Sequence, residues 1–292
     1  MNEFLRTDTA MSALSSMRTG GIAPVAYFPE TEQSLCDTVR RLTEEHKRFF
    51  VFGNLSNVLL PDGTLDFVPV ITTGIKTVTV TDTDDGIKVY AACGVSLTGL
   101  ALEFCRRDYA GLSFAYGIPG TVGGAVFMNA GAYGSEMKNI VRSVRFYDID
   151  ADTVCEIPAA DCGFGYRTSV FAHKNGVILG ASLSLAACES GKALAEAKEL
   201  MERRRKKQPL EYPSCGSAFK RPEGYFAGEL IEKCGLKGYA VGGACVSEKH
   251  AGFVVNKGGA TSADVEKLLC DVRAKVHQTF GVELEPEIRF IK

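Results

Sequence analysis

Glycine is concentrated in three loops, and this feature constrains the fold more than any other. The loops cover residues 18–23 (RTGGIA), 53–57 (GNLSN) and 118–134 (IPGTVGGAVFMNAGAYG). Glycine allows positive φ and lets backbone N–H groups approach an anion closely, so such loops can form phosphate-binding nests. None fits G-x-G-x-x-G or the P-loop pattern. Each loop alone is equally consistent with a tight turn, but three in one half of the chain favour a dinucleotide.

The hydrophobic pattern alternates between helix and strand periods. A helix that follows the N-cap Thr31 is flanked by two strand-like runs, and alternation on both sides of Asp85-Gly86 predicts a β-hairpin. A second hairpin is expected at residues 143–159 and a further strand at 176–186. Further helices are expected at residues 97–109, at 193–209, and from a cap at Ser262 to Gly281. The sequence pattern changes after Pro209, and this change predicts a domain boundary near residues 200–212.

Charge and hydropathy exclude several classes of protein. The 292 residues include 33 basic and 35 acidic side chains, which argues against nucleic-acid binding through a general basic field. The basic cluster at residues 203–207 is expected on a solvated face near a helix C-terminus. No run approaches the roughly 18 apolar residues of a membrane span, and no secretory signal is evident at the N-terminus. We therefore expect a cytoplasmic protein without membrane or nucleic-acid partners.

The ten cysteines and four histidines do not predict a metal site. No two cysteines form C-x-x-C, and the histidines show neither H-E-x-x-H nor zinc-finger spacing. Cysteines scattered through apolar stretches are expected to be reduced and mostly buried.

Three residues outside the glycine loops are candidates for chemistry. Ser217 lies between Gly216 and Ala218, a setting that lets a hydroxyl face a ligand, although a turn serine is the ordinary alternative. Arg167 precedes an apolar strand, a setting in which an arginine alone is more often a surface ion pair than an anion clamp. Glu287 is flanked by apolar residues, which suggests a carboxylate inside a strand near a buried face. By themselves these residues do not identify an enzyme.

Taken in order, the motifs resemble the UDP-N-acetylenolpyruvoylglucosamine reductases, the MurB family, in its compact second type. The matching segments span residues 18 to 291 and are RTGG, GNLSNVLL, GIPGTVGGAVFMNAGAYG, YRTSVF, SCGSAFKRP, AGELIEKCGLKG, VSEKHAGFVVN and PEIRFI. The glycine-rich run alone indicates an FAD-binding α+β domain, whereas the Ser217 and Glu287 motifs point to the reductase.

The resemblance implies a fold and an activity. It implies an FAD-binding two-subdomain (PCMH-type) α+β module, residues 1–72 and 73–204, followed by a smaller α+β substrate-binding domain, residues 205–292. FAD would lie between the first two domains. The enzyme would be a UDP-N-acetylmuramate dehydrogenase that uses NADPH and FAD to reduce UDP-N-acetylglucosamine enolpyruvate to UDP-N-acetylmuramate. This places it in peptidoglycan synthesis and cell wall biogenesis, and hence in cell shape and cell division, as a monomer or weak homo-oligomer.

The resemblance also implies residue roles. Hydride would pass to the terminal vinyl carbon, Ser217 would protonate the neighbouring carbon, and Arg167 and Glu287 would stabilise the enolate-like carboxylate. The implied cofactor-binding residues are Arg18, Thr19, Gly20, Gly53, Asn54, Leu55, Ser56, Asn57, Ile118, Pro119, Gly120, Thr121, Gly123, Gly124, Ala125, Asn129, Ala130 and Gly131. The implied substrate-binding residues are Tyr166, Lys220, Asn256 and Lys257.

Physical chemistry is consistent with these roles and identifies one departure. A cation and a proton-sharing acid at the substrate carboxylate stabilise the transition state more than the ground state. Glu287 can act as that acid only if it holds a proton, so its pKa must be raised. Serine is a weak acid, so Ser217 must be closely positioned and re-protonated through a relay. The departure is Leu55, where the family pattern often has glycine. A different backbone path there would weaken or reroute the pyrophosphate contact.

Three alternatives remain at this stage. Another flavin oxidoreductase on the same scaffold, such as an oxidase of a hydroxy acid or sugar, would not need the Ser217 and Glu287 segments. A non-catalytic sensor of a cell-wall precursor would bind the sugar nucleotide without flavin reduction. An NTP-binding module is disfavoured by the missing P-loop.

Overall fold

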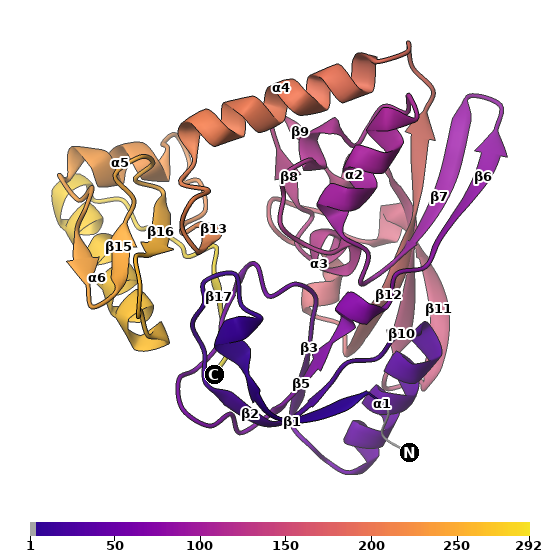
Figure 1. Cartoon of the computed structure of the whole chain (residues 1–292), viewed down its shortest axis with the longest axis horizontal. Helices are drawn as coiled ribbons and strands as arrows, with labels where there is room; N and C mark the ends of the chain where they lie inside the picture. The colour runs from indigo at the N-terminus through magenta and orange to yellow at the C-terminus, as the bar shows by residue number, and fades with distance from the viewer. Residues whose placement is uncertain (1–3) are drawn as a thin grey trace. The chain divides into compact units, whose positions relative to one another are not determined.

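The structure is a computed structural model that describes residues 4–292 (Figure 1). The chain forms two compact units. Unit 1 comprises Met1–Arg6, Val25–Asn54 and Phe67–Arg203, and unit 2 comprises Thr7–Pro24, Leu55–Asp66 and Arg204–Lys292. Two early segments thus belong to the same unit as the C-terminal third. The three-domain division at residues 72 and 204 stays a prediction.

Unit 1 contains a five-stranded antiparallel sheet in the order β11-β10-β12-β7-β6 (Figure 1). Its strands are β6 (Val78–Thr83), β7 (Gly86–Ala92), β10 (Val141–Asp148), β11 (Thr153–Pro158) and β12 (Gly176–Ala186). β6 pairs with β7 and β10 pairs with β11, so both predicted hairpins are confirmed. The turn between β6 and β7 is Asp84-Asp85, one residue before the expected Asp85-Gly86, because Gly86 already pairs with Thr83. β12 pairs with both hairpins and is buried along most of its length.

A second sheet has the order β1-β2-β5-β3, in which β5 is parallel to β2 and β3. Its strands are β1 (Leu5–Ala10), β2 (Ile22–Tyr27), β3 (Phe49–Phe52) and β5 (Val68–Ile71). The predicted helix α1 (Glu32–Glu44) connects β2 to β3, as a crossover between parallel strands requires. Thr31 caps α1 through a reciprocal capping box with Ser34, as predicted.

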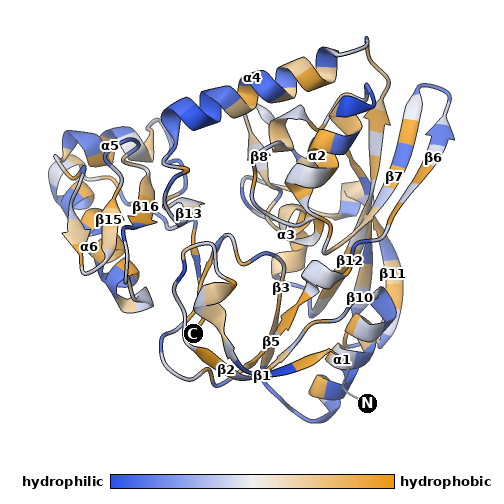
Figure 2. Ribbon diagram, viewed as in Figure 1, coloured by the Kyte–Doolittle hydropathy of each residue, from blue (hydrophilic) through white to orange (hydrophobic). Residues whose placement is uncertain are grey.

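The other helices of unit 1 follow the predicted pattern with small differences in length. They are α2 (Leu97–Arg106), α3 (Val122–Phe127) and α4 (Lys192–Lys207), and α3 packs against β7 and β12. A short ribbon of β8 (Gly131–Ala132) and β9 (Ser135–Glu136) follows α3. The C-terminal part of α4, which runs into unit 2, carries the basic cluster and is hydrophilic in Figure 2. One expectation was wrong, because Arg204 within this cluster is buried rather than solvated.

Unit 2 is built on a four-stranded sheet in the order β13-β16-β15-β14. Its strands are β13 (Ser214–Ser217), β14 (Ala240–Val241), β15 (Ala244–Val246) and β16 (Phe253–Asn256), and its helices are α5 (Ala227–Lys233) and α6 (Ser262–Phe280). A parallel pair, β4 (Val58–Leu59) with β17 (Arg289–Phe290), joins the early segment to the end of the chain. The stripe of α6 that faces the core is the predicted one: Val265, Leu268, Leu269, Val272 and Val276.

The ends of α6 confirm one prediction and correct another. Gly281 ends the helix with φ of 68°, the left-handed conformation that favours glycine. The N-cap is Thr261 rather than Ser262. Its hydroxyl accepts from the Asp264 N–H, and the Asp264 carboxylate accepts from the Thr261 N–H. The Asp62 carboxylate accepts hydrogen bonds from the Ser262 and Ala263 N–H groups, at 3.0 Å each. The N–H groups at the start of α6 therefore find their acceptors within unit 2.

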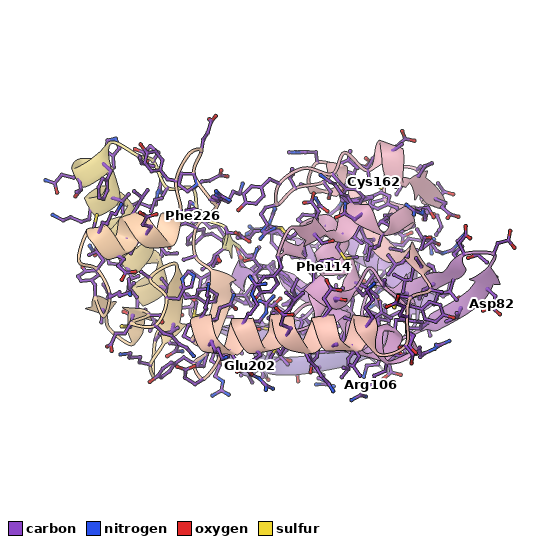
Figure 3. The ribbon with its side chains drawn as sticks, turned by 90° about the horizontal axis from the view of Figure 1, so that it is seen from above. Asp82, Arg106, Phe114, Cys162, Glu202 and Phe226 are labelled. Atoms are coloured by element: carbon purple, nitrogen blue, oxygen red, sulfur yellow. The ribbon has the colours of Figure 1, made fainter. Side chains whose placement is uncertain are left out.

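The ten cysteines are free thiols, and six of them are buried. Cys162, labelled in Figure 3, belongs to the buried group, whereas Cys270 is exposed. Within residues 4–292, no cluster of three or more His, Cys, Asp or Glu side chains could hold a metal ion. None of the helices in this range is long and apolar enough to cross a membrane.

Candidate active site

In unit 1, the glycine-rich run after residue 117 packs closely against the loop that follows β3. Thr121 caps α3 through its side chain and lies against Gly53, where a Cβ atom would stand 2.2 Å from the Thr121 hydroxyl oxygen. The Asn54 side-chain amide donates to the Pro119 carbonyl at 3.2 Å. The structure therefore brings together two of the loops that the sequence marked as phosphate-binding candidates.

The glycines of α3 divide into one that packs against protein and one that faces open space. A Cβ atom at Gly123 would approach the Cys93 side chain to 2.8 Å, so glycine is needed there for packing. A Cβ atom at Gly124 would meet only the Thr121 hydroxyl at 3.6 Å, and Gly124 is exposed. Ile118 and Ala125 are held by backbone bonds within the run. The N–H groups of Val122 and Gly123 donate to the Val95 and Cys93 carbonyls, and that of Gly124 donates to the Thr121 hydroxyl, so the start of α3 already has acceptors in the protein. The exposed Gly124 leaves the surface beside Thr121 open to a ligand.

Arg167 lies at the tip of a two-residue hairpin in unit 1. Gly165 and Thr168 pair through both backbone bonds, and Arg167 takes φ of 56° between them. Its guanidinium donates to the Gly131 carbonyl at 3.1 Å and lies 5.1 Å from the ring centre of Tyr166. Arg167 and the exposed Tyr166 are thus adjacent to the glycine-rich run, which the sequence alone did not show.

Asn129 lies inside the protein, and the neighbouring Ala130 is half-buried. Asn129 is fully buried with φ of 43°, and its side chain makes three hydrogen bonds to protein atoms. The Ala130 N–H donates to the Ala125 carbonyl at 2.8 Å. Contact of either residue with the cofactor stays a prediction.

In unit 2, Ser217 ends strand β13 at a bulge. From the pair Ser214–Val255 to the pair Ser217–Phe253, the chain advances three residues along β13 but only two along β16. Gly216 absorbs the extra residue with φ of 75°. Ser217 is exposed, whereas Cys215 and Ala218 are buried. The bulge therefore turns a hydroxyl outward at the end of an otherwise packed strand.

Glu287 lies next to Ser217 in the same unit, although the expectation that it lies inside a strand was wrong. Its N–H donates to the Ala218 carbonyl at 2.9 Å, and Phe219 pairs with Pro286. This pairing places Glu287 one register position from Ser217. Pro286 has no N–H to extend the ladder, so β17 begins only at Arg289. Glu287 is half-buried rather than sealed in the core.

The early segment of unit 2 supplies the remaining residues of the GNLSN loop. The Asn57 amide donates to the Glu287 carbonyl at 3.0 Å, and the Asn57 carbonyl accepts from the Arg289 N–H at 3.0 Å. Leu55 is buried with φ of 48°, so it keeps the left-handed conformation that glycine would take. The backbone N–H groups of Leu55 and Ser56 donate to no acceptor within residues 4–292. Such unused donors around a left-handed residue suit an anion.

Residues 18–20 form a tight turn in unit 2. Arg18 and Gly20 take φ of 56° and 111°, and Arg18 is exposed. The Thr19 hydroxyl is buried and has no hydrogen-bond partner among the described residues. A buried hydroxyl without a partner costs about 1–3 kcal/mol, and a bound ligand that accepts its hydrogen bond would remove that cost.

The expected substrate-binding residues of unit 2 are engaged with protein partners. The Asn256 amide donates to the Met17 carbonyl at 3.0 Å, and its oxygen accepts from two backbone N–H groups. Lys257 forms an ion pair with Glu248 at 3.2 Å, and Lys220 forms one with Glu285 at 2.5 Å. A nearby aromatic residue that the sequence did not mark is Phe226 (Figure 3), which is 57% exposed beneath the Arg221 guanidinium.

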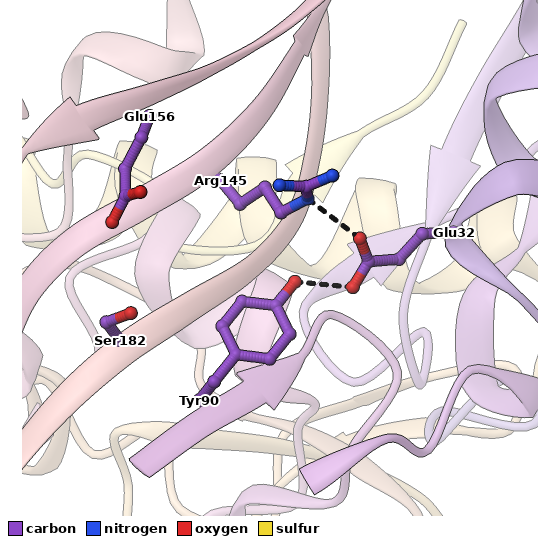
Figure 4. A pocket seen from close by; sticks show the side chains of 5 residues that line it. All are labelled: Glu32, Tyr90, Arg145, Glu156 and Ser182. Carbon is purple, nitrogen blue, oxygen red and sulfur yellow. Dashed lines mark hydrogen bonds and ion pairs between the residues drawn. The ribbon is translucent and has the colours of Figure 1, made fainter. Parts of the chain in front are cut away.

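A polar pocket in unit 1 was also missed (Figure 4). It has a volume of about 280 Å³ and is lined by Glu32, Tyr90, Arg145, Glu156 and Ser182. Both oxygens of Glu32 are engaged, one by the Tyr90 hydroxyl and one by Arg145 at 3.0 Å. Burial and the Glu32 carboxylate raise the pKa of Tyr90, so the phenol keeps its proton. The cluster attaches the first turn of α1 to the five-stranded sheet.

Comparison with known proteins agrees with this geometry. Residues 23–156 match the family model described as an FAD binding domain, and residues 208–291 match the model of the C-terminal domain of UDP-N-acetylenolpyruvoylglucosamine reductase. The first match makes the protein a flavoprotein with an FAD-binding α+β fold, as expected.

Full-length relatives define the family. The chain is 42% identical over 285 residues to the UDP-N-acetylenolpyruvoylglucosamine reductase of Clostridium beijerinckii, covering 98% of this chain and 92% of the relative. It is 43% identical to that of Caldicellulosiruptor bescii, covering 99% and 91%. The crystal structure of the Thermus caldophilus reductase (MurB) superposes with a TM-score of 0.82 at 30% identity, covering 99% and 100%. The chain belongs to the UDP-N-acetylenolpyruvoylglucosamine reductase family.

Proposed function

We propose that this protein reduces UDP-N-acetylglucosamine enolpyruvate to UDP-N-acetylmuramate, with NADPH as reductant and FAD as cofactor. The observation that carries the proposal is the pairing of residues 218–220 with 285–287, which brings Ser217 and Glu287 within one register position. A scaffold that only bound FAD would need neither an outward serine at a bulge nor a carboxylate beside it. The pairing therefore supports a reductase over the other flavin oxidoreductases.

Each unit, taken by itself, contains residues suited to hold FAD. In unit 1 the Thr121 hydroxyl lies beside the exposed Gly124 at the start of α3, and in unit 2 the unused N–H groups of Leu55 and Ser56 can donate to phosphate oxygens. The unpartnered Thr19 hydroxyl can donate to the cofactor. When bound, FAD would accept a hydride from NADPH and deliver it to the substrate.

The side chains of the chain itself would manage the charge and the proton. Hydride addition to an enol ether that carries a carboxylate places new negative charge beside an existing anion. The Arg167 guanidinium, already oriented by the Gly131 carbonyl, would stabilise that charge, and Glu287 would share a proton with the carboxylate. Ser217 would then protonate the neighbouring carbon. A positioned general acid contributes about 10²–10⁴-fold to such a step.

Substrate contacts and cellular context follow from the same proposal. We assign the exposed Tyr166 and the ion-paired Lys220 and Lys257 to contacts with the sugar nucleotide. Asn256, whose amide is bonded within unit 2, would act by holding the fold around it. We assign the protein to the cytoplasm and to cell wall biogenesis, with consequences for cell shape and cell division. We expect a monomer or weak homo-oligomer.

Anaerobic NADPH consumption by the purified flavoprotein tests the proposal. We expect sustained consumption only when UDP-N-acetylglucosamine enolpyruvate is present, with one NADPH oxidised for each sugar nucleotide reduced. A flavin that NADPH reduces but that the sugar nucleotide does not reoxidise would reject the proposal and favour another oxidoreductase. Binding of the sugar nucleotide without any flavin reduction would favour a precursor sensor.

A further inference from the structure

The buried side chain of Asn129 connects the hairpin that carries Arg167 to other segments of unit 1. The Asn129 amide nitrogen donates to the Gly165 carbonyl at 2.9 Å and to the Glu136 carboxylate at 2.8 Å, and its oxygen accepts from the Lys138 N–H at 2.9 Å. Both donors and the acceptor of this amide are therefore used. An amide satisfied in this way is a rigid connection between three backbone segments.

The backbone conformation at this position also favours asparagine. Asn129 is fully buried with φ of 43°, a left-handed conformation that asparagine tolerates better than most residues. A second contact holds the other side of the hairpin, where the Ser169 hydroxyl donates to the Phe127 carbonyl at 2.7 Å. Phe127 is the last residue of α3, and Asn129 follows it two residues later. The hairpin base is thus attached to the glycine-rich run at two points.

We propose that Asn129 is a positioning residue that acts on the reaction through Arg167, and not a cofactor ligand. This inference rests on the proposed function of Arg167. Gly165 is two residues before Arg167 in a hairpin with only two residues at its tip, so a shift at the Gly165 carbonyl moves the arginine directly. The guanidinium must meet both the Gly131 carbonyl and the substrate carboxylate, and displacement by about 1 Å can cost on the order of 10²-fold in rate.

The test uses the FAD-loaded protein and measures the two half-reactions separately by stopped flow. In Asn129→Gly, which keeps the left-handed backbone, reduction of the flavin by NADPH should keep its wild-type rate. Reoxidation by UDP-N-acetylglucosamine enolpyruvate should slow by about 10²-fold. In an Arg167→Ala background, adding Asn129→Gly should cause no further slowing. A purely structural role would instead give additive effects in the double variant.

Two further variants keep the test decisive if Asn129→Gly folds poorly. Ser169→Ala removes only the second attachment and should slow reoxidation in the same direction by a smaller factor. Glu136→Gln is the matched control, because its side-chain oxygen can still accept from Asn129 while the Lys138 ion pair at 2.5 Å is lost. It should leave both half-reactions unchanged. In the cofactor-free protein, hydrogen exchange at the Thr168 N–H should rise in Asn129→Gly and not in Glu136→Gln.

The outcomes separate this inference from the proposed function. If the wild-type protein is not reoxidised by the sugar nucleotide, the proposed function fails. If the wild-type protein is reoxidised and Asn129→Gly behaves like it, only the positioning role is rejected. Loss of FAD affinity or slower reduction by NADPH in Asn129→Gly would return Asn129 to the cofactor site and overturn the inference.

Discussion

Gly53 and Gly124 offer a sharp comparison, because both lie beside Thr121 and their replacement by alanine should have opposite effects on stability. The Cβ atom of Gly53→Ala would stand 2.2 Å from the Thr121 hydroxyl oxygen and 3.3 Å from its Cβ atom. The first distance is far inside van der Waals contact, so Thr121 must rotate and lose its cap on α3. The Cβ atom of Gly124→Ala would meet the same hydroxyl at 3.6 Å, an ordinary contact.

The magnitudes follow from these contacts. Overpacking costs about 1–3 kcal/mol and loss of a threonine cap costs about 1 kcal/mol, while the reduced entropy of the unfolded chain returns about 0.4–1 kcal/mol. Gly53→Ala should therefore lower the free energy of unfolding by about 1–3 kcal/mol. Gly124→Ala should raise it by about 0.5–1 kcal/mol, because alanine is the better helix former. Each kcal/mol corresponds to a change in Tm of about 2–4 °C.

Cofactor binding should respond differently from stability. If the start of α3 receives the pyrophosphate, the methyl group of Gly124→Ala obstructs it, so FAD affinity should fall although the cofactor-free protein is more stable. The assay is thermal unfolding of the cofactor-free proteins, followed by fluorescence titration with FAD. Unchanged FAD affinity in Gly124→Ala would refute the placement of the pyrophosphate, and unchanged stability in Gly53→Ala would refute the contact with Thr121.

The other predictions concern unit 2 and the cysteines. Leu55→Gly should relieve about 1 kcal/mol of left-handed strain but lose a buried side chain worth about 2–5 kcal/mol. Urea unfolding should therefore show a free energy of unfolding lower by about 1–4 kcal/mol, and a gain in stability would contradict the burial. Burial lowers the pKa of His250, whose Nδ1 accepts a backbone N–H, so its contribution to stability is present above pH 6.5 and is lost as pH falls through the lower folded pKa. Urea unfolding between pH 7.5 and 5 should therefore show a smaller loss in His250→Asn than in wild type, and equal losses would count against this assignment. Iodoacetamide should label Cys270 in the folded protein, whereas Cys93 and Cys215, whose pKa burial raises to about 12, should react only after unfolding; mass spectrometry that finds either of these labelled first would contradict their burial.

Local signals in the sequence predicted the local structure well. The capping residue Thr31 and the terminal Gly281 each act within a few residues, and each was found where expected. The first hairpin also formed as expected, although its turn is Asp84-Asp85, one residue before the predicted position. The cap of α6 was misplaced by one residue because Thr261 and Ser262 both have suitable side chains. Only the reciprocal bond with Asp264 distinguishes them.

Pairing between distant segments could not be predicted in the same way. The position of Glu287 depends on a ladder with residues 218–220, and the position of Asn57 depends on β17, more than two hundred residues away in the sequence. The polar cluster around Glu32 depends on helix α1 and on strands β7 and β10, which come together only in the folded unit. Such contacts carry no periodic signal. The resemblance to a family was needed to select Ser217, Arg167 and Glu287 from many similar residues.

Leu55 shows how a departure from the family pattern is accommodated. A leucine in place of glycine suggested a rerouted loop, yet the residue takes φ of 48° and buries its side chain. Burial offsets the cost of about 1–2 kcal/mol that the left-handed conformation imposes on a residue with a Cβ atom. Leu55 therefore adopts the left-handed backbone conformation that glycine takes most readily.

The measurement that most directly tests the central claim is the flavin redox state of Ser217→Ala under anaerobic conditions. The account predicts that NADPH reduces the flavin of this variant at the wild-type rate, and that UDP-N-acetylglucosamine enolpyruvate then reoxidises it at least about 10²-fold more slowly than in wild type. Reoxidation at the wild-type rate would show that the proton comes from another group. Failure of both half-reactions in a folded, FAD-loaded variant would show that Ser217 serves the cofactor rather than the substrate.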